Sequence, residues 1–139
     1  MLKDILAEKS FFIFDMDGTI TDTEPLHFIA YQRTLDELAP GFVLEEEEFR
    51  TCYVGHPEWE IYELLQKAHN IVFDTDAFLQ RRIAHLFEIV RERGLTTTPF
   101  YRQICSMFPD KTRIMLTSQR TEILERFRRE VDFGGDLSR

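Results

Sequence analysis

The chain has 139 residues, of which 43% are hydrophobic and 30% are charged. This length and composition allow a domain with a buried core and exclude a disordered chain. The net charge of −8 is a poor match for nucleic acid or an anionic membrane. No apolar run approaches the roughly 18 residues of a membrane helix, and the N-terminus lacks the apolar centre of a signal peptide. We therefore expect a cytoplasmic protein with neither nucleic acid nor membrane as a partner.

The first predicted element is a strand. Ser10–Phe14 is a short, continuous apolar run that ends in Asp-Met-Asp-Gly-Thr. A run of that length without alternation is typical of a central parallel strand buried on both faces.

A long helical stretch follows this strand. Its four predicted helices have no strand between them, which predicts a small bundle inserted as a unit of its own. The first helix begins at Pro25, with Thr23 as N-cap, and stops at Pro40-Gly41. The other three are predicted over Glu45–Tyr53, Pro57–Asn70 and Asp74–Arg93.

The α/β pattern returns after this bundle. Pro99–Phe108 reads as a helix, Arg113–Leu116 as a strand and Arg120–Arg129 as a helix, whereas Val131–Arg139 is expected to be irregular. Two parallel strands are fewer than the five or six strands of a usual doubly wound sheet. We therefore predict an α/β fold with a partial core made of residues 1–20 and 96–139, interrupted by a helical domain over residues 21–95.

Two carboxylates follow the first strand, where open α/β sheets bind their ligands. Residues two apart point the same way in extended backbone, so Asp15 and Asp17 are expected to converge on one site. Carboxylates that close repel each other unless a cation lies between them or one is protonated. Magnesium often binds one or two carboxylates together with phosphate oxygens, so Asp15 and Asp17 are candidate Mg²⁺ ligands.

The neighbouring residues suit a phosphate group. Gly18 allows a sharp turn, and Thr19 can offer a hydroxyl or an amide. If the two predicted strands pair, their ends lie about 5 Å apart. Thr117 and Ser118 would then face the same pocket, beside the amides at the N-terminus of the next helix, which is a site for an anion.

The segment FDMDGTITDTEPLH (Phe14–His27) resembles the first motif of the haloacid dehalogenase superfamily, in its phosphatase and β-phosphoglucomutase-like branch. The resemblance continues through most of the chain, as strand, helical cap, helix, second strand and second motif. It implies a Rossmann-like parallel sheet core with an inserted four-helix cap domain. It also implies a Mg²⁺-dependent phosphatase of small phosphorylated metabolites.

The resemblance assigns roles to the candidate residues. Asp15 would attack phosphorus and form an aspartyl-phosphate, and Asp17 would act as general acid and base. A carboxylate oxygen of Asp15 and the backbone carbonyl of Asp17 would bind magnesium, and Thr117 would hold the transferring phosphoryl group. His27 and Tyr31 match a histidine near the acid/base Asp and an aromatic cap residue of the same branch.

Two departures from the family pattern matter. Three residues after Gly55, the mutase branch has an arginine for the substrate phosphate, but this chain has Glu58. The family also has a later Lys and an acidic pair after another apolar strand. Lys111 precedes the second strand, and Asp132 and Asp136 follow no apolar strand, so the chain is expected to be truncated before these two motifs.

Other readings of the same residues remain. A calcium-binding loop would need its Gly at the sixth position and Glu in place of Leu26, and a receiver domain would need its phosphorylated Asp on a third strand. The alternative interpretations are a structural histidine for His27 and a helix N-cap for Thr117. Three functions stay open: a phosphatase, a non-catalytic fragment or binding module, and a phosphosugar mutase. The chain is expected to expose an unpaired sheet edge or to mask it, for instance by self-association.

Overall fold

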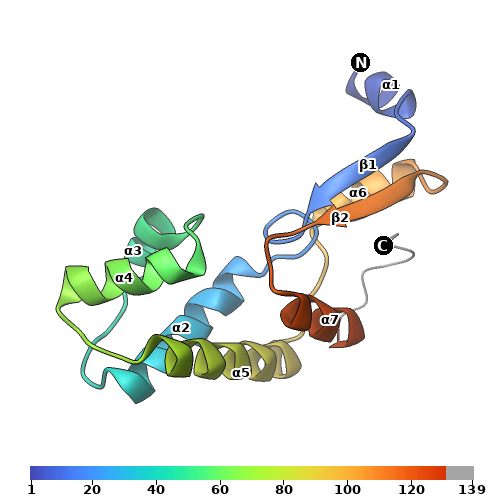
Figure 1. The fold of residues 1–139 in the computed structure, drawn as a ribbon. Helices are drawn as coiled ribbons and strands as arrows, with labels where there is room; N and C mark the ends of the chain where they lie inside the picture. The colour runs from blue at the N-terminus through green and yellow to red at the C-terminus, as the bar shows by residue number, and fades with distance from the viewer. Residues whose placement is uncertain (131–139) are drawn as a thin grey trace. The chain divides into compact units, whose positions relative to one another are not determined.

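The computed structural model describes residues 1–130, so the predicted irregular segment Val131–Arg139 lies outside the described part. The chain divides into two compact units, which are described separately (Figure 1). One contains Met1–Glu24 and the chain from Gly94 onwards, and the other contains Pro25–Arg93. No helix in residues 1–130 combines the length and the hydropathy that crossing a membrane requires.

The first unit is an α/β layer built on two parallel strands. Its elements are α1 (Leu2–Ala7), β1 (Phe11–Asp15), α6 (Pro99–Met107), β2 (Thr112–Leu116) and α7 (Thr121–Glu130). The strands pair in register from Phe11 with Thr112 to Asp15 with Leu116. The predicted mixed α/β class with a parallel sheet is therefore confirmed.

Aromatic packing fixes α6 against one face of this sheet. Phe12 and Phe14 are buried, and their rings meet Phe108 and Tyr101 of the α6 segment at centroid distances of 5.5 and 5.1 Å. The helix starts where Pro99 follows Thr98, whose hydroxyl accepts a hydrogen bond from the Tyr101 amide at 3.2 Å. The alternate side chains of β1 point to the opposite face.

The second unit is helical. Its elements are α2 (Glu24–Leu38), α3 (Glu46–Glu48), the π-helical turn η1 (Phe49–Tyr53), α4 (Glu58–His69) and α5 (Thr75–Arg93). The predicted second helix thus differs from the observed one. After one α-helical turn the backbone widens, and the Val54 amide bonds the Phe49 carbonyl at 3.1 Å, five residues back.

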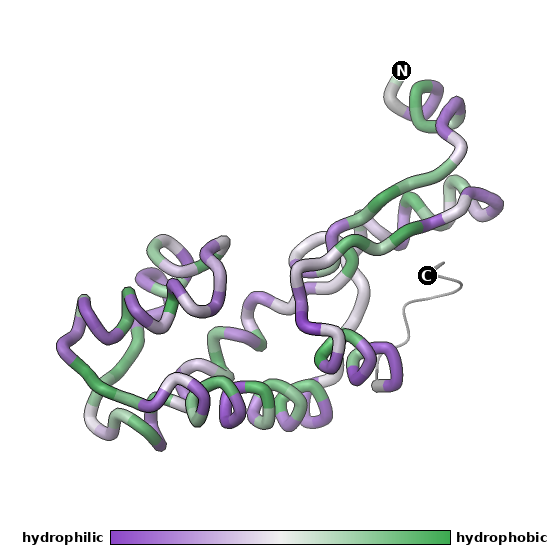
Figure 2. The backbone as a smooth tube through the Cα atoms, viewed as in Figure 1, coloured by the Kyte–Doolittle hydropathy of each residue, from purple (hydrophilic) through white to green (hydrophobic). Residues whose placement is uncertain are grey.

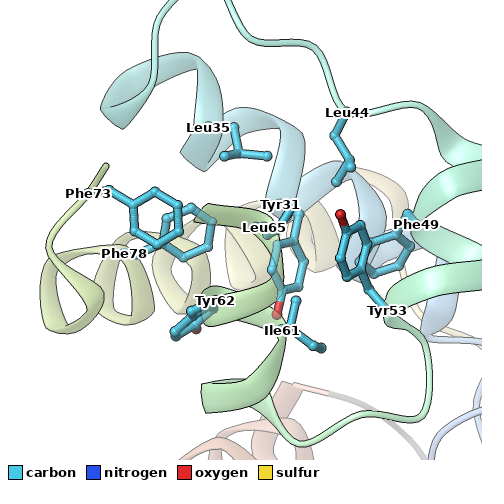
Figure 3. Packing of buried hydrophobic residues seen from close by; sticks show 10 residues of the cluster. All are labelled: Tyr31, Leu35, Leu44, Phe49, Tyr53, Ile61, Tyr62, Leu65, Phe73 and Phe78. Atoms are coloured by element: carbon cyan, nitrogen blue, oxygen red, sulfur yellow. The ribbon is translucent and has the colours of Figure 1, made fainter. Parts of the chain in front are cut away.

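Aromatic side chains form the core of the helical unit (Figure 3). Phe78 is fully buried and stacks on Phe73 with centroids 4.4 Å apart, and the Tyr62 ring lies 4.9 Å from Phe78. Tyr31 of α2 completes the contact at 5.7 Å. The remaining buried members of this cluster are Leu35, Leu44, Phe49, Tyr53, Ile61 and Leu65. The helical unit therefore has a hydrophobic core of its own.

Replacement of Phe78 by Ala tests this core. The change removes a fully buried ring and leaves a cavity between α2, α4 and α5, so the free energy of unfolding should fall by about 3–5 kcal/mol. Urea denaturation followed by circular dichroism measures the change. Val72→Ala is the matched control, because Val72 is 86% exposed and its truncation should cost no more than about 0.5 kcal/mol. Equal losses in the two variants would contradict this assignment of the core.

Candidate active site

The two strand ends bring separate parts of the sequence together. Asp15 pairs with Leu116, and Thr117 and Ser118 follow directly after Leu116. Neighbouring strands lie about 4.8 Å apart, so both predicted motifs meet at one end of the sheet. The side chain of Asp15 is exposed, and within residues 1–130 its carboxylate makes no hydrogen bond or ion pair. Its oxygens can therefore accept an external ligand.

The turn after β1 is tightly hydrogen-bonded. Gly18 has a φ of 74°, a conformation that glycine adopts without strain, and its amide donates to the Thr21 carbonyl at 2.7 Å. The amides of Thr19 and Thr21 both donate to the Met16 carbonyl, at 3.3 and 3.0 Å. Because the Thr19 amide already donates to Met16, the Thr19 hydroxyl is the group that can donate to a phosphate oxygen. The Asp17 carbonyl takes no part in these bonds.

Asp17 is held from two sides. The hydroxyl of Thr23 donates to Oδ1 of Asp17 at 2.5 Å, and the side-chain amide of Gln119 donates to Oδ2 at 2.9 Å. Thr23 is fully buried. The two donors come from the segments after β1 and after β2, and together they fix the direction of the carboxylate.

The sequence did not reveal these two partners. Thr23 directly precedes α2, as its predicted N-cap role requires, and its hydroxyl also donates to Asp17. Gln119 was read only as part of the segment after the second strand. The contact of Gln119 with Asp17 follows only from the pairing of the two strands, so the sequence near Gln119 does not indicate it.

Thr117 stabilises the turn that carries Gln119. The amide of Gln119 donates to the Thr117 hydroxyl oxygen at 3.1 Å, which closes a local turn of the kind that Ser and Thr form. Ser118 between them is exposed. Helix α7 begins only at Thr121, so Thr117 lies four residues before the helix rather than at its N-cap.

A second clamp ties the turn after β1 to α6. The amide of Thr98 donates to the Ile20 carbonyl at 2.7 Å, and the Thr98 hydroxyl donates to the Thr19 carbonyl. The same hydroxyl oxygen caps α6 through Tyr101. Thr98 therefore links the start of α6 to the turn that carries Asp17.

His27 belongs to the helical unit, unlike the other six predicted site residues. Its Nδ1 lies 3.3 Å from a guanidinium nitrogen of Arg82. Since a guanidinium only donates, Nδ1 must accept, which leaves the ring proton on Nε2. Arg82 is 4% exposed, forms an ion pair with Glu58 and lies 5.3 Å from the centre of the Tyr31 ring. Burial raises the pKa of Tyr31, and the nearby Arg82 charge partly opposes this rise.

The carboxylates at the strand ends fit part of a magnesium site. Mg²⁺ commonly takes one or two protein carboxylates and completes its octahedron with waters and phosphate oxygens. The exposed Asp15 carboxylate and the Asp17 carbonyl offer donors of this kind. Within residues 1–130, no three His, Cys, Asp or Glu side chains cluster closely enough to hold a metal. The described residues thus provide a partial donor set for Mg²⁺.

Comparison with known proteins identifies the family of the chain. The family model of haloacid dehalogenase-like hydrolases matches residues 12–113. A phosphorylated carbohydrates phosphatase of Thermotoga maritima is 34% identical over 122 residues, which cover 84% of this chain and 54% of that protein. A parallel sheet with Asp-x-Asp at a strand end and this family match define the chain's class: it belongs to the haloacid dehalogenase-like hydrolases.

Solved structures show the same fold. A Thermotoga maritima protein assigned as a beta-phosphoglucomutase is 31% identical with a TM-score of 0.63, over 87% of this chain and 55% of that one. CbbY from Rhodobacter sphaeroides, solved with phosphate, has a TM-score of 0.72 at 18% identity, over 92% of this chain and 59% of that one. The chain spans little more than half the length of these relatives.

Replacement of Thr23 by Val tests the clamp on Asp17. The change keeps the shape of a buried side chain but removes the donor to a carboxylate, so the free energy of unfolding should fall by about 1.5–3 kcal/mol. Urea denaturation measures the loss. Thr51→Val is the matched control, because the Thr51 hydroxyl is exposed and donates to the Glu47 carbonyl instead of a carboxylate, and its loss should cost about 0.5 kcal/mol or less. A Thr23→Val protein as stable as the wild type would show that this hydrogen bond does not organise the site.

Proposed function

We propose that the chain carries the nucleophile and the acid/base residue of a cytoplasmic, Mg²⁺-dependent phosphatase that acts on small phosphorylated metabolites. The observation that carries the proposal is the pairing of two different carboxylates at one strand end. Asp15 is exposed and has no hydrogen-bond or ion-pair partner within residues 1–130, whereas Asp17 is oriented by Thr23 and Gln119. The first suits a nucleophile, and the second suits a group that must transfer a proton in a fixed direction.

The reaction takes two steps. An oxygen of the Asp15 carboxylate attacks phosphorus, a P–O bond to Asp15 forms, and the bond to the leaving oxygen breaks. Asp17 in its neutral form gives its proton to that oxygen, so an alcohol leaves and Asp17 becomes a carboxylate. Asp17 then takes a proton from water, whose oxygen attacks phosphorus and releases inorganic phosphate with the free Asp15 carboxylate. Bound Mg²⁺ would offset the negative charge shared by Asp15 and the phosphoryl group.

The other predicted residues take supporting roles in this proposal. The hydroxyls of Thr19, Thr117 and Ser118 would donate to phosphoryl oxygens, and Gly18 keeps the turn narrow enough for a close approach. By the family resemblance, His27 would be a further phosphate-binding residue. We propose that residues 1–20 and 96–139 form the core domain and that residues 21–95 form its cap domain.

A phosphosugar mutase is the weaker candidate for this site. The Thermotoga maritima neighbour assigned as a beta-phosphoglucomutase supports it. Glu58, however, stands where the mutase branch has an arginine for a substrate phosphate. In the structure Glu58 is paired with Arg82 within the helical unit. A carboxylate at this position does not bind a second phosphate, so we favour substrates with a single phosphate.

A non-catalytic module is the second candidate, favoured by the charges at the site. Lys111 lies at the amino end of β2, where its ammonium donates to the Ala7 carbonyl at 2.9 Å, at the opposite end of the strand from Thr117. It therefore cannot serve the lysine role of the family. Charge stabilisation is the main catalytic contribution in phosphoryl transfer, so we expect weak or no turnover from this chain alone, below about one per second.

Trapping the covalent intermediate tests the proposed function more directly than turnover does. The 139-residue chain is incubated with acetyl phosphate and Mg²⁺, quenched in acid and analysed by mass spectrometry. The phosphoryl group should be found on Asp15, and Asp15→Asn should remove it. Asp22→Asn is the matched control, since Asp22 is an exposed carboxylate of the same segment and its loss should leave labelling unchanged. Labelling of the Asp15→Asn variant, or no labelling of the wild type, would refute an aspartyl-phosphate at this site.

A further inference from the structure

Two buried hydrogen-bond donors between α6 and the sheet have no acceptor among the described residues. Tyr101 is 2% exposed, and its hydroxyl is shielded from solvent. The same holds for Nε of Arg113. Within residues 1–130, neither atom has a hydrogen-bond partner. Buried polar atoms of this kind are costly and uncommon in folded proteins, so the pair calls for a physical explanation.

Both donors lie on the side of the sheet that α6 covers. The Tyr101 ring meets the Phe14 ring at a centroid distance of 5.1 Å. Arg113 pairs in register with Phe12, whose ring contacts Phe108, so the Arg113 side chain also points toward α6. Figure 2 shows the hydrophobic colouring along the two strands on which α6 packs. The two polar side chains therefore share the layer between the helix and the strands.

A thiol is the third member of this cluster. Cys105 follows Tyr101 by four residues in α6, so the two side chains lie one turn apart on the same face of the helix. Burial raises the pKa of Tyr101 to about 12, the neighbouring Cys105 thiol adds to this rise, and the positive charge of Arg113 opposes it. Both neighbours are thus close enough to act on the Tyr101 hydroxyl. Sulfur is only a weak acceptor, so the thiol does not satisfy the donors.

We propose that Cys105 is a redox modification site, at which a hydroperoxide converts the thiol to a sulfenic acid that Tyr101 and Arg113 stabilise. Cys105 is half-buried, so a small peroxide can reach it. The sulfur attacks one peroxide oxygen, an S–O bond forms, and the O–O bond breaks. With hydrogen peroxide, the second oxygen leaves as water after taking up a proton. The sulfur loses two electrons, and the peroxide gains them.

The added oxygen supplies the acceptor that the cluster lacks. The Tyr101 hydroxyl can donate to it, and the positive charge of Arg113 favours its deprotonated form, which is the stronger acceptor. Cys52 has different surroundings, since it is exposed and lies 3.6 Å from the exposed hydroxyl of Thr51. The cluster therefore predicts different fates for the oxidised forms of the two cysteines.

The test compares the two cysteines in single-cysteine chains and does not depend on any phosphatase activity. Cys52→Ser leaves Cys105 as the only thiol, and Cys105→Ser leaves Cys52. Each chain receives an equivalent of hydrogen peroxide, and mass spectrometry follows the product with one added oxygen, which a dithiol should return to the starting mass. We expect the sulfenic acid of Cys105 to persist about tenfold longer than that of Cys52, because it gains hydrogen bonds to an ionised acceptor.

Removal of the Tyr101 hydroxyl locates the stabilisation. In the Cys52→Ser chain, Tyr101→Phe should shorten the lifetime of the sulfenic acid about tenfold. In the Cys105→Ser chain, which is the matched control, the same change should leave the lifetime at Cys52 unchanged. The reduced Tyr101→Phe chain should resist urea at least as well as its parent, because the hydroxyl has no hydrogen bond to lose.

Four results would overturn the proposal. Three concern the oxidised chains: no oxygen added at Cys105, equal lifetimes at the two cysteines, or no effect of Tyr101→Phe on the lifetime at Cys105. The fourth is a loss of stability in the reduced Tyr101→Phe chain, which would mean that the hydroxyl already has an acceptor.

Discussion

The parallel pairing of β1 with β2 is the constraint on which the candidate site depends. Ninety-six residues of sequence lie between Asp15 and Thr112, where β2 begins. Only the register of the two strands brings the segments that follow them together. The pairing is held by the rings of Phe12 and Phe14 against α6. Once the strands are in register, the Gln119 amide can reach Asp17, and the Thr117 turn carries Gln119 to that position.

Backbone hydrogen bonding gives the site its rigidity. The turn after β1 satisfies its amides internally, and Thr98 ties its carbonyls to the start of α6. A loop whose polar groups are paired in this way has few alternative conformations. Asp15 and Asp17 differ in their surroundings. The side chain of Asp15 projects to solvent, whereas the carboxylate of Asp17 accepts two hydrogen bonds. The different chemistry proposed for two identical residue types follows from these surroundings.

The elements of the fold were largely predictable from the sequence. The sequence pattern predicted both strands, and it predicted helices α2, α4, α5, α6 and α7 to within a few residues. The turn η1 was not predicted, because five residues are too few for hydrophobic periodicity to distinguish a π-helix from an α-helix. Partners that join distant segments were also missed. The sequence around Thr23 and Gln119 does not indicate that both side chains donate to Asp17, since the three residues meet only after the strands pair.

The exposed face of β1 and the candidate site lie on the same side of the sheet. Side chains alternate along β1, so Asp15 lies on the same face as Phe11 and Ile13, at the end of the strand. Phe11 and Ile13 are 50% and 57% exposed, and Asp15 is exposed beside them. Burial of this face would exclude water from one side of the Asp15 carboxylate and strengthen the charge interactions there. The strength of the charge interactions at Asp15 therefore depends on how far this face of the sheet is exposed to solvent.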